Sequence, residues 1–189
     1  MRFFGLEKVL NDEKLQAEIV QCVKKGYVFF YPTDTVYGFG CDATKREAVG
    51  RIRSNKETEH PFSVIAPSKE WIIENLIVHD TTVLDRLPGP FTIIFKKKSA
   101  SFMENVCKTN SLGVRIPDHP LTKIIQKSEK PFVTTSANIS GQETIMSAKE
   151  IPREVAMGLD IIIDAGELSN PPSTILDCMD LECREIKRK

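Results

Sequence analysis

The 189-residue sequence lacks the features that mark secreted, membrane-spanning or strongly charged proteins. Lys and Arg number 26, and so do Asp and Glu, so the net charge of zero predicts no overall attraction to nucleic acid or anionic membranes. The longest apolar stretches, such as residues 161–163, are far too short to span a bilayer. Charged residues within positions 7–13 interrupt any signal-peptide core, so we expect a mature, cytoplasmic chain that starts here.

The cysteines and histidines also lack the patterns of known metal sites. Neither a C-x-x-C pair nor an H-E-x-x-H segment occurs, which argues against a zinc ribbon or zinc hydrolase, and we expect no protein-bound metal. The odd number of cysteines argues against a disulfide framework. We therefore expect buried, reduced thiols at Cys22, Cys41, Cys107, Cys178 and Cys183. A P-loop motif is absent too, so a bound nucleotide would be held in another way.

The sequence does contain interleaved strand and helix patterns. Apolar spacing predicts a first helix from Asn11 to Lys25, and a capping box at Thr44 and Glu47 predicts another helix. Further helices are expected after Ser68, Asp80, Asp118 and Ser147. The apolar runs predict strands at 27–31, 36–41, 62–66, 91–95, 112–116, 131–135, 160–164, 174–178 and 182–186. Several strands follow one another directly, which favours an α/β fold with a mixed sheet flanked by helices over a purely doubly wound sheet.

Two clusters near the first predicted strands contain polar groups or glycines. The segment PTDTVYG (32–38) follows a buried strand, where open α/β sheets present ligand-binding groups, and it has more hydroxyls than a plain turn needs. The segment GFGCDA (38–43) matches a loose dinucleotide fingerprint, but its glycines lie inside a predicted strand. We interpret these glycines as positions of close backbone approach or a bulge.

Two basic residues stand at positions where a charge needs a partner. Arg115 lies inside an apolar strand, and either an internal carboxylate or a bound anionic group would satisfy it. Lys56 ends a predicted helix, where it could meet the helix dipole or reach a phosphate, and on its own the first interpretation is favoured.

Other polar segments are less specific. TTSANISG (134–141) follows a strand and could hold a nucleotide through backbone and hydroxyl groups, although a plain polar loop is the alternative. The hydroxyls before the strand at 174–178 are a weak signal. The basic runs 96–98 and 187–189 are typical of solvated surface. The functional alternative is that they contact the phosphate backbone of tRNA.

Five segments together resemble the YrdC-like threonylcarbamoyl-AMP synthase family. They are PTDTVYGFGCDA (32–43), PGPFTIIF (88–95), GVRIPDHP (113–120), TTSANISG (134–141) and STILD (173–177), in the family's order and spacing. The resemblance implies one YrdC-like domain over 1–189, the form without a C-terminal extension. It implies a twisted mixed parallel/antiparallel sheet with flanking helices around a deep central groove.

The resemblance also implies an activity. L-threonine, bicarbonate and ATP, with Mg²⁺ accompanying the ATP, would give L-threonylcarbamoyladenylate and pyrophosphate, which is a nucleotidyltransferase reaction. A downstream threonylcarbamoyl-transferase complex would then modify tRNA. Because the substrates supply both nucleophiles, the protein would mainly align the reactants and neutralise phosphate charge.

Carried over position by position, the resemblance implies that threonine is bound by Thr33, Thr35, Tyr37, Arg115 and Ser173. It implies that ATP is bound by Lys56, Ser136 and Asn138, with Ser111 and Ser140 as further candidates, and that Lys56 and Arg115 are catalytic.

The sequence departs from the family pattern at two places. Thr58 stands where the family has Arg, and Arg53 is a candidate replacement. The family's C-terminal Arg-x-Gly segment is missing, which leaves Arg184 or Arg188 as candidates. Thr58 keeps open a non-synthase relative that binds nucleotide, double-stranded RNA or tRNA. Carbamoyl transfer, as in hydrogenase-maturation proteins, is a third alternative, but this chain lacks the zinc-finger cysteines of those proteins.

Overall fold

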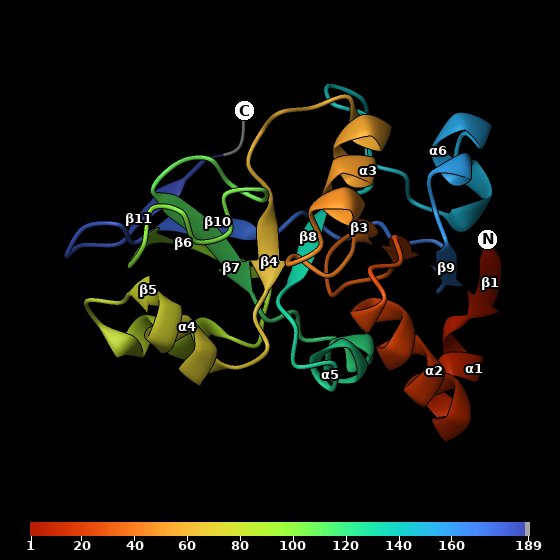
Figure 1. Cartoon of the computed structure of the whole chain (residues 1–189), viewed down its shortest axis with the longest axis horizontal. Helices are drawn as coiled ribbons and strands as arrows, with labels where there is room; N and C mark the ends of the chain where they lie inside the picture. Colours follow the sequence, from red (N-terminus) through yellow and green to blue (C-terminus); the bar gives the residue numbers. More distant parts are fainter. Residues whose placement is uncertain (188–189) are drawn as a thin grey trace.

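The computed structural model of the protein describes residues 1–187, and its strands form one long mixed sheet (Figure 1). In chain order the strands are β1 (Arg2–Gly5), β2 (Phe29–Tyr31), β3 (Gly38–Gly40), β4 (Ser63–Ile65), β5 (Leu76–Ile77), β6 (Phe91–Lys97), β7 (Ser111–Arg115), β8 (Phe132–Ser136), β9 (Ile161–Asp164), β10 (Thr174–Asp177) and β11 (Arg184–Ile186).

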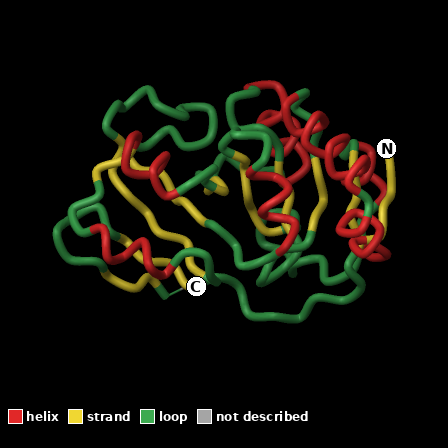
Figure 2. The backbone as a smooth tube through the Cα atoms, turned by 90° about the horizontal axis from the view of Figure 1, so that it is seen from below, coloured by secondary structure: helices red, strands yellow, loops and turns green. Residues whose placement is uncertain are grey.

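Helices lie on both sides of this sheet, as the tube view also shows (Figure 2). They are α1 (Leu6–Asn11), α2 (Glu13–Lys24), α3 (Arg46–Lys56), α4 (Lys69–Asn75), α5 (Pro120–Gln126) and α6 (Arg153–Met157), with short 3₁₀ helices η1 (Thr81–Arg86) and η2 (Ala148–Glu150). None of the helices in residues 1–187 has the length and apolar character that crossing a membrane requires.

The strand order is β1-β9-β2-β3-β8-β4-β7-β6-β10-β11, with β5 paired to β6. Parallel pairs (β1 with β9, β2 with β9, β4 with β7, β6 with β10) stand beside antiparallel ones such as β3 with β8 and β6 with β7. The prediction of a mixed sheet flanked by helices is therefore confirmed.

Both faces of the central strands are buried, which explains their continuous apolar runs. In β2, Phe30 packs into the cluster on the α3 face, whereas Phe29 and Tyr31 pack into the cluster formed with α2 and α5. Successive side chains of a strand point to opposite faces, so one run supplies both cores. The strand ends, rather than the faces, are left for the polar groups described below.

Some local predictions were wrong at chain turns. The first predicted helix is present as α2, but its cap is Asp12 and not Asn11, because Asp12 is extended and its carboxylate accepts the Leu15 N–H at 3.1 Å. The short helix α1 before it was not predicted. The Thr44 capping box does not form. The Thr44 hydroxyl instead donates to Asp42 at 2.7 Å, and α3 begins after Lys45 without a side-chain cap.

The expectation of five reduced thiols was also wrong. Cys178 and Cys183 form a disulfide across the turn between β10 and β11, where the hairpin brings their Cα atoms to 4.2 Å. Cys22, Cys41 and Cys107 are buried free thiols, as expected. The sequence spacing gave no sign of this pair, because a short hairpin places two cysteines together without any recognised motif.

Candidate functional site

A cavity lies across six consecutive strands of the sheet, β3, β8, β4, β7, β6 and β10, each of which contributes to its wall. The loop after β2 and the segment that leads into β10 form the remaining sides. Hydroxyl groups dominate the lining, which consists of Thr33, Thr35, Val36, Tyr37, Gly38, Pro61, Ser63, Thr92, Arg115, Thr134, Thr135, Ser136, Pro172, Ser173 and Ile175. The loop and strand-end clusters predicted from the sequence therefore meet in one place.

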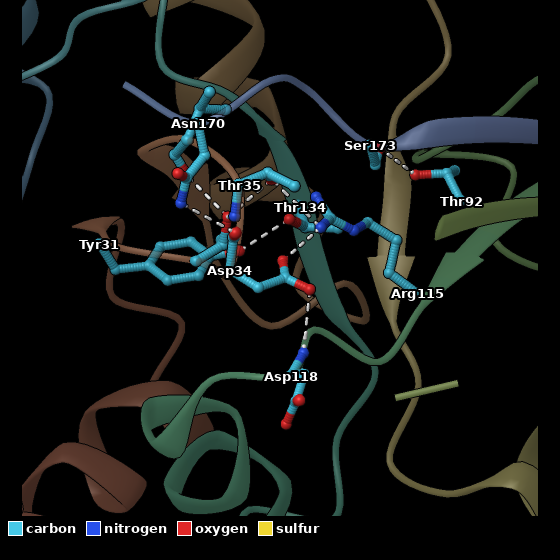
Figure 3. A network of polar contacts seen from close by, with 11 residues as sticks. Tyr31, Asp34, Thr35, Thr92, Arg115, Asp118, Thr134, Asn170 and Ser173 are labelled. Atoms are coloured by element: carbon cyan, nitrogen blue, oxygen red, sulfur yellow. Dashed lines mark hydrogen bonds and ion pairs between the residues drawn. The ribbon is translucent and has the colours of Figure 1, made fainter. Parts of the chain in front are cut away.

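Arg115, the last residue of β7, is the cation of this wall, and its partner is Asp34 (Figure 3). One Nη of Arg115 donates to a carboxylate oxygen of Asp34 at 2.7 Å and to the Thr35 hydroxyl at 3.2 Å. The side chains are only 9% and 8% exposed, and burial lowers the pKa of Arg115 while Asp34 opposes that effect. Of the two open alternatives, the internal carboxylate is thus present.

The contacts with Asp34 and Thr35 use one Nη of Arg115, so among the described residues its other Nη and its Nε keep unused donors. Its Nε is buried and has no hydrogen-bond partner among the described residues. A buried donor without an acceptor is costly, and an anionic ligand would supply one. The ion pair with Asp34 therefore leaves room for a further carboxylate on the same guanidinium.

Asp34 connects three segments at the mouth of the site. Its second carboxylate oxygen accepts the backbone N–H of Asp118 at 3.0 Å, and its backbone carbonyl accepts the side-chain amide of Asn170 at 3.3 Å (Figure 3). Asp34 was part of the sequence cluster, but no role followed from the sequence. Together with Asn170 it is a site residue that the sequence analysis missed.

The two threonines beside Asp34 are buried and hydrogen-bonded to each other at 3.0 Å. The Thr33 hydroxyl also contacts the Val36 carbonyl at 2.7 Å, which fixes the loop after β2. On the opposite wall the Ser173 and Thr92 hydroxyls lie 2.8 Å apart. Thr33, Thr35 and Ser173 thus line the same cavity as Arg115, and binding of threonine by them stays a prediction.

Tyr37 contributes to the wall, but its hydroxyl is bound elsewhere. It donates to the Gly166 carbonyl at 2.7 Å, accepts the Ala165 N–H at 2.8 Å and lies 3.2 Å from Asp164. Burial raises the pKa of Tyr37 to about 12, so the hydroxyl stays protonated. In this arrangement the phenol anchors the segment after β9, and direct binding of threonine by Tyr37 stays a prediction.

Lys56, at the end of α3, adjoins the cavity through β8. Its ammonium donates to the carbonyls of Ser136 and Asn138 at 2.6 and 2.7 Å and to the Asn138 side chain at 2.9 Å. The Ser136 hydroxyl donates to the same Asn138 oxygen at 2.6 Å. Lys56 is 5% exposed, and burial lowers its pKa to about 8. It is therefore a fixed charge beneath the loop 136–140 rather than a mobile one.

The remaining predicted ATP contacts lie outside the cavity lining. Ser111 begins β7 and bonds Thr109 at 2.9 Å, and four residues of strand, about 13 Å, separate it from Arg115. Ser140 is exposed, and its N–H donates to the Lys56 carbonyl at 3.0 Å. Ser140 thus ends the loop 136–140 beside Lys56, whereas within residues 1–187 Ser111 makes no hydrogen bond to Lys56 or that loop, and the roles of both serines in ATP binding stay predictions.

The candidates for the missing family arginines are also elsewhere. Arg53 donates hydrogen bonds to main-chain carbonyls, among them that of His60 at 2.9 Å. Arg184 lies on β11, beside Lys96 and His79, in a different surface hollow. Arg188 lies outside the described residues. In residues 1–187 no group of three or more His, Cys, Asp or Glu is placed to hold a metal ion.

Comparison with known proteins identifies relatives along most of the chain. The family described as Telomere recombination, which groups Sua5, YciO and YrdC proteins, matches residues 21–188. A Methanocaldococcus jannaschii protein provisionally named threonylcarbamoyl-AMP synthase is 35% identical, over 90% of this chain and 85% of its own. The threonylcarbamoyl-AMP synthase of Serratia proteamaculans is 30% identical, over 85% of this chain and 90% of its own.

A solved structure with the same fold contains a ligand. The crystal structure of Pyrococcus abyssi Sua5 complexed with L-threonine is 28% identical and superimposes with a TM-score of 0.82 over 98% of this chain. The chain spans only 56% of that longer protein.

Proposed function

Since the chain belongs to the Sua5, YciO and YrdC family, we propose that it is an L-threonylcarbamoyladenylate synthase. This enzyme is a nucleotidyltransferase that combines L-threonine, bicarbonate and ATP into threonylcarbamoyl-AMP and pyrophosphate. Relatives with this name align along most of their own length with this chain. A Sua5 structure with bound L-threonine shares the fold.

One observation carries the proposal: Ser136 belongs to both halves of the site. It lines the cavity that contains Arg115, and its carbonyl accepts the Lys56 ammonium at 2.6 Å. Arg115, which would bind the carboxylate, is in register with Ile65 and so with Phe132 at the start of β8. Lys56, which would act on the phosphates, bonds Ser136 at the end of the same strand. A ligand at Arg115 and a nucleotide at the loop 136–140 would be held next to each other, which is what joining them requires.

The threonine half is built from Arg115 and the hydroxyls around it. The Nη of Arg115 that has no protein hydrogen bond would bind the amino-acid carboxylate, while Asp34 keeps the guanidinium in place through the other Nη. Thr35 and Ser173 lie on opposite sides of Arg115 and would contact the rest of the amino acid.

The ATP half is built from Lys56 and the loop 136–140. The Ser136 and Asn138 side chains would contact the nucleotide, and Lys56 would place positive charge beside its phosphates. We propose that Mg²⁺ enters as the ATP complex, held by phosphate oxygens and water, because the walls offer mainly hydroxyls.

The reaction then needs two bond-forming steps. The threonine amine attacks carbon dioxide derived from bicarbonate and loses a proton, which gives a carbamate. A carbamate oxygen attacks the α-phosphate of ATP, the bond to the β-phosphate oxygen breaks, and pyrophosphate leaves. The protein's part is alignment and charge neutralisation, so no nucleophilic side chain is required. We propose that a separate transferase complex passes the product to tRNA, which would place the reaction in the cytoplasm.

Isotope labelling tests this proposal directly. The purified chain is incubated with ATP, Mg²⁺, L-threonine and ¹³C-bicarbonate, and the products are analysed by mass spectrometry. We expect threonylcarbamoyl-AMP that contains the labelled carbon, and none when threonine is omitted. Nucleotide or RNA binding without this product would instead support the non-synthase relative, with Thr58 as the first position to examine.

A further inference from the structure

Arg53 has more main-chain contacts than its place on a surface helix requires. Its guanidinium donates to the carbonyls of His60 at 2.9 Å and Val106 at 2.9 Å. Longer contacts reach Asn105 at 3.2 Å and Thr58 at 3.5 Å. The same group lies 4.5 Å from the centre of the Phe62 ring. One side chain thus satisfies acceptors on two different loops.

These two loops connect elements that build the site. Residues 57–62 lead from α3 to β4, and residues 98–110 lead from β6 to β7. The Phe62 N–H donates to the Val106 carbonyl at 3.1 Å, and an exposed ion pair joins Glu59 to Lys108. Exposed pairs contribute little, so the junction depends mainly on the Arg53 contacts and on the Phe62–Val106 main-chain hydrogen bond.

The junction adjoins the nucleotide half of the site on two sides. Arg53 stands one helical turn before Lys56, whose ammonium supports the loop 136–140. The first loop also contains Pro61, which lines the cavity just before Ser63, and Ser63 pairs with Thr134 toward the Ser136 end of β8. A loop released from Arg53 would move Pro61 and loosen the last turn of α3.

We propose that Arg53 is a positioning residue for ATP, which acts through Pro61 and Lys56 and does not touch the nucleotide. This inference rests on the proposed function. It also assigns Arg53 a role other than replacing the family arginine at position 58, because both Nη groups of Arg53 already donate to main-chain carbonyls. Lysine cannot perform this role, since one ammonium cannot stack on Phe62 and reach both loops.

The test is steady-state kinetics of Arg53→Gln and Arg53→Lys. For Arg53→Gln we expect the KM for ATP to rise about tenfold, the size of losing one charge-assisted hydrogen bond, with kcat and the threonine KM nearly unchanged. Arg53→Lys keeps the charge and should show most of the same loss. Hydrogen exchange at 57–62 and 103–107 should become faster.

The matched control is Arg51→Gln. Arg51 lies on the same helix and clamps Asp160 at 2.8 Å and the Gly158 carbonyl at 3.0 Å, away from the cavity. The Arg51→Gln variant should be less stable than wild type but should have the same KM for ATP. An unchanged ATP KM in Arg53→Gln, or an equal rise for threonine, would overturn the inference. If wild type releases no pyrophosphate, the proposed function fails, and calorimetric ATP affinity of the same variants then decides on Arg53.

Discussion

The Arg115 guanidinium and the Asp34 carboxylate meet at 2.7 Å although 81 positions separate them in the chain. Both side chains are almost fully buried. The pair stabilises the fold and also forms the base of the proposed carboxylate site, because it leaves two guanidinium nitrogens, Nε and one Nη, without a partner among the described residues. These two roles can be separated experimentally.

Substituting Arg115 tests its role in binding. Arg115→Ala should raise the threonine KM by about a hundredfold, since a charged hydrogen-bonding group is lost, and should change the ATP KM far less. The threonine KM of Arg115→Lys should lie between those of wild type and Arg115→Ala, because lysine keeps the charge but lacks the planar guanidinium group. Threonine and ATP titrations of pyrophosphate release measure both constants. An unchanged threonine titration would remove Arg115 from the site.

Substituting Asp34 tests its role in stability. Asp34→Ala leaves Arg115 buried without its ion-pair partner, so the free energy of unfolding should fall by about 3 kcal/mol. Asp34→Asn retains an acceptor oxygen and should lower the free energy of unfolding by less than Asp34→Ala does. Urea denaturation measures the change, with exposed Asp118→Ala as a control expected within about 0.5 kcal/mol of wild type. Equal stability of Asp34→Ala and the control would contradict the proposed importance of the pair.

Lys56 gives a prediction for pH dependence. Burial lowers its pKa to about 8, so in the free enzyme its positive charge is lost as pH rises through this value. The kcat/KM for ATP should therefore fall above pH 8, by about tenfold per pH unit, because this constant reports the free enzyme. In Lys56→Arg the fall should move to higher pH. An identical profile in both proteins would assign the ionisation to another group.

The same lowered pKa has the opposite effect on stability. Between the folded value of about 8 and the ordinary value of 10.5, the unfolded chain binds more protons at this lysine than the folded chain does. The contribution of Lys56 to the free energy of unfolding should therefore increase as pH rises across this window. Comparing urea midpoints of wild type and Lys56→Met at several pH values isolates it.

Two glycines provide a matched test of the packing. A Cβ at Gly40 in β3 would collide with the Phe132 ring and the Val133 carbonyl oxygen, whereas a Cβ at Gly50 in α3 meets nothing within 4 Å. Gly40→Ala should destabilise the protein by about 1–3 kcal/mol through overpacking. Gly50→Ala should stabilise it by about 0.5–1 kcal/mol through helix propensity. Thermal melts in which Gly40→Ala is neutral would contradict the close approach of β3 and β8.

Sequence patterns predicted the central strands because both faces of those strands are buried. β2 and β9 read as unbroken apolar runs, since their alternate side chains enter two cores. β1 was missed because its burial alternates, with Phe3 57% exposed, and because its ladder to β9 joins segments about 160 positions apart. Such a pairing leaves no local trace in the sequence.

The site was predictable in residue type and only partly in arrangement. The apolar setting of Arg115 showed that it needs a partner, but no spacing selected Asp34 among the acidic residues. The contacts of Lys56 and Arg53 are largely to main-chain carbonyls, which every residue has, so the sequence could not indicate them. The partner of Arg115 and the carbonyl contacts of Lys56 and Arg53 both depend on where the loops lie in the folded structure.

Pyrophosphate release tests the central claim most directly. The purified chain is assayed with ATP and Mg²⁺, and L-threonine and bicarbonate are added separately and together. We predict release only when both are present, as expected for a carbamate that attacks the α-phosphate. Release that ignores threonine, or none under any condition while ATP still binds, would contradict the assignment as a threonylcarbamoyl-AMP synthase.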